Sequence, residues 1–399
     1  MSASALWMQI MTASSGLQFL LGTSLGVLAY IYVGYPLLVW YRSRRNAKAI
    51  DDHSSPIKMQ DATVSVVIVA HNEARILPRK IQSLLASENA WRIREILIGS
   101  DGSTDGTDRV LAELHEPRVK LISFSERRGK PSVLNDVVPK CQSDYVLLAD
   151  ARQLFDSKCL DRLLAQFEDP SVGVVSGELI LRTESQESTA AAGIGFYWRY
   201  EKFIRRCESQ WRGVPGATGA CYMLRKELFQ PIPPATILDD VAIPMQAITR
   251  GYRCLFEPQA VVFDEPSKST GQESVRKRRT IAGVAQLACL FPQWLLPWKN
   301  PLWFEYISHK MLRLASPVFM ALTLIANLAL AELPLYRLLL LTQMAFYTSA
   351  FVGWCYQAAG RGSRLFGPPL MFVTLNVTTA AAIWDALFSR YRVVWQKTM

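Results

Sequence analysis

Paired cysteines are missing from this sequence, and histidine is scarce in it. Seven cysteines occur among 399 residues, each of them isolated, with no Cys-x-x-Cys pair and no histidine at metal-ligand spacing from any of them. This pattern argues against a zinc site and against a disulfide framework, and it is typical of reduced thiols in a cytosolic domain. The cysteines are Cys141, Cys159, Cys207, Cys221, Cys254, Cys289 and Cys355.

The chain also lacks internal repeats and low-complexity tracts. Charged residues make up 20% of it and hydrophobic residues 50%. That balance is too polar for a protein buried wholly in lipid, and it lies toward the apolar side for a soluble enzyme. A chain of this length exceeds the usual size of a single core. We therefore expect one soluble domain with membrane-spanning elements at its ends.

The net charge of +10 suits nucleic acid, anionic lipid and phosphate-bearing substrates alike. Its placement is more informative. One basic cluster, at 42–48, follows an apolar run, and a second, at 276–279, precedes another. The basic residues do not alternate with aromatic residues as they do on a sheet that binds nucleic acid. We therefore expect a topology signal in the first cluster, an anion site in the second, and no nucleic-acid partner.

No charge interrupts the sequence from Leu17 to Trp40, which is long enough to cross a bilayer as a helix. Basic residues are absent before this stretch and follow it from Arg42 onward. The positive-inside rule therefore predicts an outside N-terminus and a cytosolic location for the residues after Arg42. The length of the stretch and its missing basic flank argue against a cleavable signal peptide.

Apolar and aromatic sequence returns after Gly283. The segments 285–298 and 301–313 are rich in aromatic residues and predict interfacial helices. Leu314–Ala331 and Leu338–Gln357 predict membrane spans. Phe366–Phe388 is diluted by polar residues, and whether it crosses the membrane, re-enters it or lies in the interface stays open. The expected organisation is an N-terminal transmembrane helix (1–42), a linker (43–62), a cytosolic domain (63–283), interfacial helices (284–313) and a C-terminal transmembrane region (314–399).

Between the two ends, short apolar runs alternate with helical periodicity. Leu77, Ile81, Leu84 and Leu85 share one helical face, as do the apolar residues of 110–114. This alternation predicts an α/β domain with a mostly parallel sheet and helices on both faces, and ligands at the carboxyl ends of its strands. The predicted strands are Val64–Ala70, Glu95–Gly99, Val119–Ser123 and Tyr145–Ala149.

Polar residues stand where three of these strands end. His71, Asn72 and Glu73 follow the first strand, and Asp101 and Asp150 follow the second and the fourth. A carboxylate beside a glycine turn can bind a base or a ribose while the backbone approaches closely. The alternative is an ordinary strand-to-helix turn capped by a nearby serine or aspartate. Acids at neighbouring strand ends favour a nucleotide site.

An ordered series of motifs resembles glycosyltransferase family 2. Val64–Glu73 looks like its opening strand and uracil-contacting loop, and Asp101–Thr107 is similar to its most recognisable signature. Gly129-Lys130 matches the lysine-containing helix that comes next. The later motifs are Gly216–Ala220, which resembles the acceptor-side loop, Leu238-Asp239-Asp240, which resembles the acidic pair with the catalytic base, and 276–283, which takes the place of the Gln-x-x-Arg-Trp element.

This resemblance implies a GT-A fold and inverting transfer from a nucleotide-diphosphate sugar, and it gives each residue an expected role. Asp240 is the expected base, with Asp239 as its supporting neighbour, and an acidic start to the following helix is the competing explanation of this pair. The donor-binding residues are expected to be His71, Asn72, Glu73, Asp101, Lys130, Asp150, Arg276, Arg278 and Arg279, and the acceptor-binding residues Gly219, Ala220 and Thr280.

The arginines at 276–279 are expected to neutralise the diphosphate leaving group. A basic patch at the membrane surface is the alternative for the same residues. The resemblance also implies Mg²⁺ or Mn²⁺ held by Asp150. Here the sequence departs from the family, because Arg152 stands at the second acidic position of its metal motif and repels a cation. Thr280 replaces the tryptophan of processive synthases, so single-sugar transfer is as well supported as polymer synthesis.

The membrane ends resemble those of hyaluronan, chitin and poly-N-acetylglucosamine synthases. The expected protein is therefore an integral membrane enzyme of a bacterial inner or plasma membrane. It acts in polysaccharide synthesis on a glycan or a lipid-linked acceptor, and partners in an export complex are possible. Two alternatives stay open at this point. One is a polyprenyl-phosphate glycosyltransferase, and the other is a non-catalytic membrane subunit that binds a nucleotide sugar.

Overall fold

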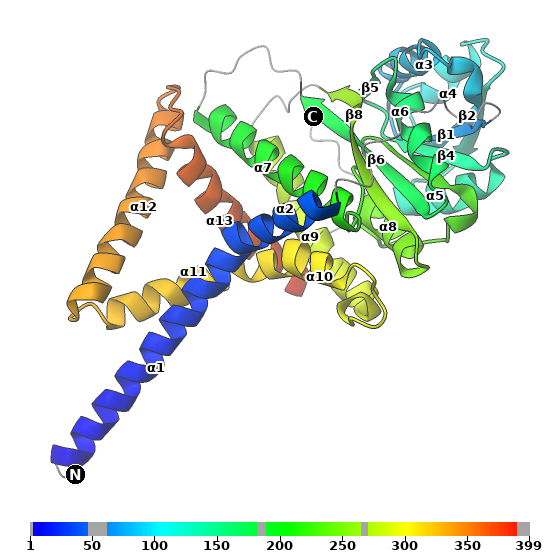
Figure 1. Cartoon of the computed structure of the whole chain (residues 1–399). Coiled ribbons are helices and arrows are strands. Elements are labelled where there is room, and N and C mark those ends of the chain that lie inside the picture. The colour runs from blue at the N-terminus through cyan, green and yellow to red at the C-terminus, as the bar shows by residue number, and fades with distance from the viewer. Residues whose placement is uncertain (1–2, 47–61, 182–188, 265–269, 389–399) are drawn as a thin grey trace. The chain divides into compact units, whose positions relative to one another are not determined.

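The computed structural model describes residues 3–46, 62–181, 189–264 and 270–388 (Figure 1). The chain divides into two compact units. The sheet unit contains the described residues of 42–181 and 205–306, and the helical unit contains those of 3–41, 189–204 and 307–388.

One half of the sheet is parallel, as the alternating apolar runs predict. Strand β1 (Val64–Ala70) pairs in parallel with β2 (Ile93–Asp101) on one side and with β4 (Tyr145–Ala149) on the other. Strand β3 (Val119–Phe124) extends the sheet beyond β2, also in parallel. The carboxyl ends of these strands therefore lie at one edge of the sheet.

The other half of the sheet is mixed, and no strand in it is predicted above. Strand β7 (Tyr222–Arg225) runs antiparallel to β4 and to β6 (Val172–Leu181). Strand β8 (Arg253–Asp264) is parallel to β6, and the two-residue β5 (Leu154–Phe155) closes the sheet against it. The eight strands follow the order β3-β2-β1-β4-β7-β6-β8-β5.

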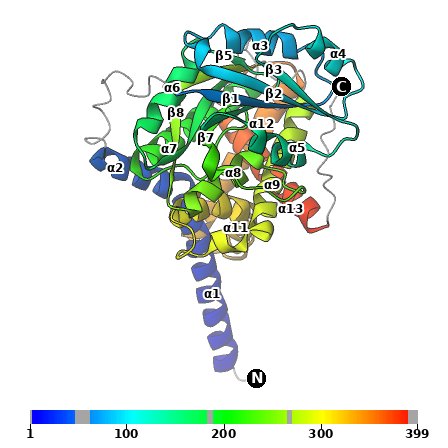
Figure 2. The same ribbon diagram turned by 90° about the vertical axis from the view of Figure 1, so that its right-hand side faces the viewer.

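Helices cover both faces of the sheet, and Figure 2 shows α3 and α4 on the opposite side of β1–β3 from α5. The helices of the sheet unit are α3 (Leu77–Leu85), η3 (Ala90–Arg92), α4 (Thr107–Ala112), α5 (Lys130–Val137), η4 (Val138–Lys140), α6 (Cys159–Ala165), η5 (Gln166–Glu168), η6 (Lys226–Leu228), α8 (Asp239–Thr249), α9 (Thr270–Leu290), η7 (Pro292–Leu295) and α10 (Trp303–Glu305). Helix α7 (Thr189–Trp211) contributes residues to both units.

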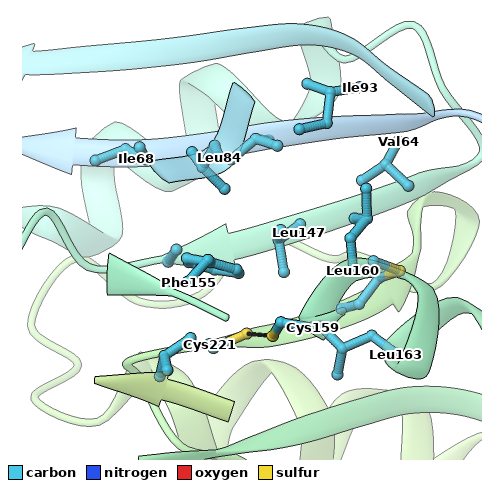
Figure 3. Close-up of a cluster of buried hydrophobic side chains, with 14 of the residues drawn as sticks. Val64, Ile68, Leu84, Ile93, Leu147, Phe155, Cys159, Leu160, Leu163 and Cys221 are labelled. Carbon is cyan, nitrogen blue, oxygen red and sulfur yellow. Dashed lines mark hydrogen bonds between the residues drawn. The ribbon is translucent and has the colours of Figure 1, made fainter. Parts of the chain in front are cut away.

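The main apolar core lies between the sheet and the helices α3 and α6 (Figure 3). Ile68 and Leu147 enter it from the strands, and Leu84 and Leu160 from the helices. Each buried side chain of this size contributes about 2 kcal/mol of apolar burial. This core holds β1 and β4 rigidly, and so it holds the residues at their carboxyl ends.

The helical unit consists of long apolar helices. Its elements are α1 (Ala3–Ala29), η1 (Tyr30–Gly34), the start of α2 (Tyr35–Asn46), the first part of α7, η8 (Tyr306–Met311), α11 (Leu312–Ala329), α12 (Pro334–Ala358) and α13 (Gly367–Leu387). Helix α1 packs on α11, where Leu21 contacts Ala326 and Leu330. Helices α12 and α13 pack against each other.

Within the residues that the structure describes, three helical stretches are long and apolar enough to cross a membrane, judged by length and composition. They are Ser15–Arg45, Trp303–Ala329 and Pro334–Ala358. The first and third contain the predicted spans. The second joins part of the predicted interfacial segment 301–313 to the span predicted after it. The segment at 366–388, whose placement the sequence leaves open, is largely helical as α13.

Candidate active site

A cleft opens at the carboxyl ends of β1, β2 and β4. It holds about 580 Å³ of space, its open mouth included. Because neighbouring parallel strands end at the same edge of a sheet, residues far apart in sequence meet there. Its lining residues are Val69, Ala70, His71, Glu73, Asp101, Arg127, Gly129, Lys130, Asp150, Ala151 and Arg152. Among them, Val69, Arg127 and Ala151 are not singled out by the sequence.

Asp101 organises the loop that leads to the lysine. Its two carboxylate oxygens accept the backbone N–H groups of Arg128 at 2.6 Å and Gly129 at 2.9 Å. The carbonyl oxygen of Asp101 lies 2.7 Å from Nδ1 of His71. Gly102 has φ +62°, and a Cβ there would lie 2.7 Å from the backbone nitrogen of Arg127. Asp101 therefore lines the cleft and also shapes the backbone around it.

The two loops after β1 and β2 are joined by hydrogen bonds. Asn72, in the left-handed region at φ 57°, accepts the backbone N–H of Thr104 at 2.7 Å through Oδ1. Thr107 accepts the N–H of Glu73 at 3.0 Å, and Asp105 accepts the N–H of Thr107 at 3.0 Å. Asp105 thus binds the first N–H group of α4, although the N-cap residue itself is Gly106.

Lys130 stands between two carboxylates. Its Nζ lies 2.9 Å from Oδ1 of Asp150 and 2.9 Å from Oδ2 of Asp239. Both contacts pair the ammonium with a carboxylate, and the contact with Asp150 is also a hydrogen bond. Burial opposes the charge of the lysine, but the two carboxylates outweigh burial and raise its pKa. The ammonium is therefore a permanent cation at the centre of the site.

The position of Lys130 depends on close packing behind it. Lys130 is the first residue of α5, directly after Gly129 at φ +88°. Helix α5 packs on β2 at Gly99, where an added Cβ would lie 2.3 Å from Cγ1 of Val133. Heavy atoms cannot approach so closely, so a glycine is required at position 99 for this helix to lie where it does.

The surroundings of Asp240 change its ionisation. Its Oδ2 accepts the backbone N–H of Gly219 at 2.9 Å. Burial and, next, the charge of Asp239 raise its pKa from 3.8 to about 6, while Lys130 and the Gly219 hydrogen bond oppose this rise. Asp239 and Asp240 also begin α8, as the competing explanation requires. A helix start alone favours the ionised form, whereas this environment favours the protonated one.

The predicted acceptor residues are divided between two elements. Gly219 lies so near Asp240 that an added Cβ would be 3.2 Å from its Oδ2, and Ala220 next to it is buried. Thr280 lies on α9, exposed, and its hydroxyl donates to the carbonyl oxygen of Arg276 at 3.0 Å.

The basic residues 276–279 lie on α9, and the charges of the acids in the site act on Arg279. Arg279 is affected by the charges of Asp239, Asp240 and Asp150, although burial, the larger effect, lowers its pKa. Arg276 and Arg278 are half-buried on the same helix.

Metal-binding groups are sparse at this site. Within the parts of the chain that the structure describes, no three His, Cys, Asp or Glu side chains are arranged to hold a metal ion. Asp150 is the predicted ligand, and Arg152 lines the same cleft with its side chain exposed. A single carboxylate together with donor phosphates is still a ligand set that Mg²⁺ accepts.

Known structures and sequences identify the class. A mannosyltransferase from Pyrobaculum calidifontis, solved in complex with GDP-Man and Mn²⁺, matches 93% of this chain and 100% of its own, with a TM-score of 0.71 and 22% sequence identity. The fold is therefore the GT-A fold of glycosyltransferases. Residues 65–232 match the family model of glycosyl transferase family 2. The chain is a glycosyltransferase, and the part of it at residues 65–232 is similar to this family.

Relatives among curated sequences are synthases. The poly-beta-1,6-N-acetyl-D-glucosamine synthase of Staphylococcus aureus is 25% identical over 211 residues, which cover 50% of this chain and 49% of the synthase. The synthase of the same name from Staphylococcus epidermidis is 23% identical over 211 residues. The chain spans about half the length of the curated relatives it matches.

Proposed function

We propose that the enzyme moves a sugar, with inversion, from a nucleotide-diphosphate sugar to a hydroxyl of a glycan or of a lipid-linked acceptor. A UDP-sugar is the proposed donor. The observation that carries this proposal is the position of Lys130, which joins Asp150 on the donor side to Asp239, the neighbour of Asp240. A cation, a donor-side acid and a buried acid with a raised pKa thus occupy one site.

Asp240 is the proposed general base. Inverting transfer needs a group that takes the proton of the acceptor hydroxyl as it attacks the anomeric carbon. A base works best when its pKa is near the working pH, and the pKa of Asp240 is about 6. Asp239 supports it by holding the lysine, and Gly219, Ala220 and Thr280 are proposed to contact the acceptor.

The donor is proposed to bind in the cleft of β1, β2 and β4. His71, Asn72, Glu73 and Asp101 lie at its nucleotide end in our proposal, since they follow β1 and end β2. The diphosphate leaving group gains negative charge as the bond to the sugar breaks, and fixed cations in a partly buried site stabilise that charge. Lys130 and Arg279 are the proposed cations, with Arg276 and Arg278 on the same helix.

A divalent cation, Mg²⁺ or Mn²⁺, is proposed to bind through Asp150. When bound, it would neutralise part of the diphosphate charge. Oδ1 of Asp150 accepts a hydrogen bond from Lys130, and the side chain is partly exposed, so it can reach a ligand in the cleft. Arg152, in the same cleft, is proposed to supply cationic charge beside the metal.

The proposed setting is the cytosolic face of a bacterial inner or plasma membrane. The three apolar helices support a membrane protein, and the similarity to poly-beta-1,6-N-acetyl-D-glucosamine synthases supports synthesis of a polysaccharide. The basic residues after the first span support a cytosolic catalytic domain. Partners that export the product are part of the same proposal.

The test is a donor panel on purified membranes. Uridine and guanosine diphosphate sugars, each with a labelled sugar, are offered with and without Mn²⁺, and the product is separated into aqueous polymer and organic-extractable lipid. We expect transfer from a UDP-sugar. Label in the organic phase would instead identify a lipid-phosphate acceptor, and absence of transfer from every donor would overturn the proposal.

The matched variants are Asp240→Asn and Glu113→Gln. Both remove one negative charge, but Glu113 lies on the exposed surface beyond α4. Asp240→Asn should lower turnover by about 10³-fold, as expected for loss of a general base, while donor affinity stays within about threefold. Glu113→Gln should behave like the natural enzyme. Unchanged transfer by Asp240→Asn would disprove the assigned role.

A further inference from the structure

Arg205, on the C-terminal part of α7, makes one hydrogen bond to the loop behind the proposed base and one to strand β6. Its Nη1 donates to Oγ1 of Thr218 at 2.6 Å, and its Nη2 donates to Oγ of Ser176 at 2.8 Å. Ser176 in turn accepts the backbone N–H of Thr218 at 3.0 Å. The guanidinium also lies over the ring of Phe256, 4.5 Å from its centroid. Arg205 is therefore held on three sides.

The loop that Arg205 contacts is the one that holds Asp240. Gly219, next to Thr218, donates its N–H to Oδ2 of Asp240 at 2.9 Å, and Ala217 donates its N–H to the Asp240 carbonyl oxygen at 2.7 Å. Two consecutive contacts thus connect the guanidinium to the carboxylate: Arg205 to Thr218, and Gly219 to Asp240.

The helix that carries Arg205 is itself fixed to the sheet. Ser209, four residues further along α7, accepts the backbone N–H of Phe256 at 2.8 Å and lies 3.3 Å from the carbonyl oxygen of the same residue. Ser176 and Phe256 belong to the paired strands β6 and β8. The guanidinium is therefore presented to the loop from a rigid element, as an effective positioning group requires.

We propose that Arg205 is a positioning residue for the transfer reaction: it fixes the loop 216–220 so that the N–H of Gly219 stays directed at the carboxylate of Asp240. This inference rests on the proposed function, in which Asp240 is the base. It assigns to α7 a part in catalysis although Arg205 touches neither substrate nor the reacting atoms. A planar guanidinium can contact two hydroxyls at once, which the single ammonium of a lysine cannot reproduce in the same geometry.

The expected signature lies in the ionisation of Asp240. Burial, the charge of Asp239 and the charge of Asp150 raise the pKa of Asp240. The Gly219 hydrogen bond and the charge of Lys130 lower it, because both favour the charged carboxylate. If the loop moves away, the pKa of Asp240 should rise further. A loop that served only to stabilise the fold would lower the amount of active enzyme and leave this pKa unchanged.

The experiment compares Arg205→Met with Arg206→Met. Arg206 is the exposed neighbour on the same helix, so both variants lose one cation from α7. We expect Arg205→Met to lower kcat by about 10- to 100-fold and to move the acid limb of the kcat profile upward by about one pH unit, the size expected for one charge-assisted hydrogen bond. Donor Kd should stay within about twofold, and Arg206→Met should match the natural enzyme.

A second pair of variants covers the case in which Arg205→Met does not fold. Thr218→Val keeps the shape of the side chain but removes the acceptor of Arg205, and it should move the acid limb in the same direction. Arg205→Lys should restore less than half of the lost kcat. An acid limb that stays in place in Arg205→Met and in Thr218→Val would overturn the positioning role, while Asp240→Asn still tests the base. Full activity of Asp240→Asn would instead overturn the proposed function itself.

Discussion

Asp239 and Asp240 are adjacent in sequence, yet their carboxylates have different partners. Oδ2 of Asp239 lies 2.9 Å from Nζ of Lys130, whereas Oδ2 of Asp240 accepts the N–H of Gly219 at 2.9 Å. One acid thus faces a buried cation, and the other faces a backbone amide. The amide hydrogen bond opposes the rise in the pKa of Asp240, but burial and the charge of Asp239 outweigh it and raise this pKa to about 6, so Asp240 can exchange a proton near neutral pH.

The first prediction concerns pH. The pKa of Asp240 is raised to about 6, chiefly by burial. A base must be deprotonated to act, so activity should rise with pH through about 6 and be nearly constant above about 7. The acid limb is measured as kcat between pH 4.5 and 8 at saturating donor. A limb centred near pH 4, the ordinary range of aspartate, would exclude Asp240 as the group that controls it.

The second prediction concerns the effect of Arg152 on metal binding at Asp150. Arg152→Asp places a second carboxylate near Asp150 and removes a cation, so Mn²⁺ should bind about tenfold more tightly, because added carboxylate charge favours a divalent ion. Free Mn²⁺, followed by electron paramagnetic resonance in the presence of the nucleoside diphosphate, gives this affinity without an activity assay. Arg152→Gln is the control: it removes the repulsion without adding a ligand and should give a smaller gain. Equal Mn²⁺ affinity in all three proteins would contradict the prediction.

The third prediction concerns the buried Lys80. Its Nζ donates to the carbonyl oxygen of Gln153 at 2.7 Å and lies 4.2 Å from the centroid of the Phe155 ring. Burial, only partly offset by surrounding charges, lowers its pKa from 10.5 to about 8. Between pH 8 and 10.5 the unfolded chain therefore binds more protons than the folded one, so folding stability should rise with pH over that window, by up to roughly 3 kcal/mol.

The variant that checks this is Lys80→Met, with Lys158→Met at an exposed lysine as control. The Tm of the natural protein relative to Lys80→Met should increase as pH rises from 8 to 10. Relative to Lys158→Met it should change little. A constant difference between the natural protein and Lys80→Met across this range would show that Lys80 does not titrate there.

The parallel half of the sheet could be predicted closely from sequence. Strands β1 and β4 have the predicted bounds because each is a mainly apolar run buried on both faces. The mixed half could not be predicted in this way. Strand β7 has only four residues, and β8 contains Pro258 and alternates between buried and half-buried positions. Strand β7 pairs antiparallel with β4 and β6, and β8 pairs in parallel with β6; this pairing joins segments far apart in sequence, which local pattern does not encode.

The candidate site, too, could be predicted only in part from the sequence. The acids at the ends of β2 and β4 stand out in the sequence because each ends an apolar run. The contact between Lys130 and Asp239 does not stand out in the sequence, because the fold alone brings these distant residues together. Arg205 carries no signal of its own, since it is one of several cations on a helix. Its relation to the loop at 216–220 becomes visible only through contacts.

Gly99 has a consequence for the chemistry although it lies outside the cleft. With a single hydrogen atom as its side chain, it lets Val133 press against β2 at a distance that any larger residue would forbid. Val133 lies one turn along the helix that begins at Lys130, so the depth of this contact sets how far the ammonium reaches toward its two acids. The absence of a side chain at Gly99 therefore determines where the Lys130 ammonium lies relative to Asp150 and Asp239.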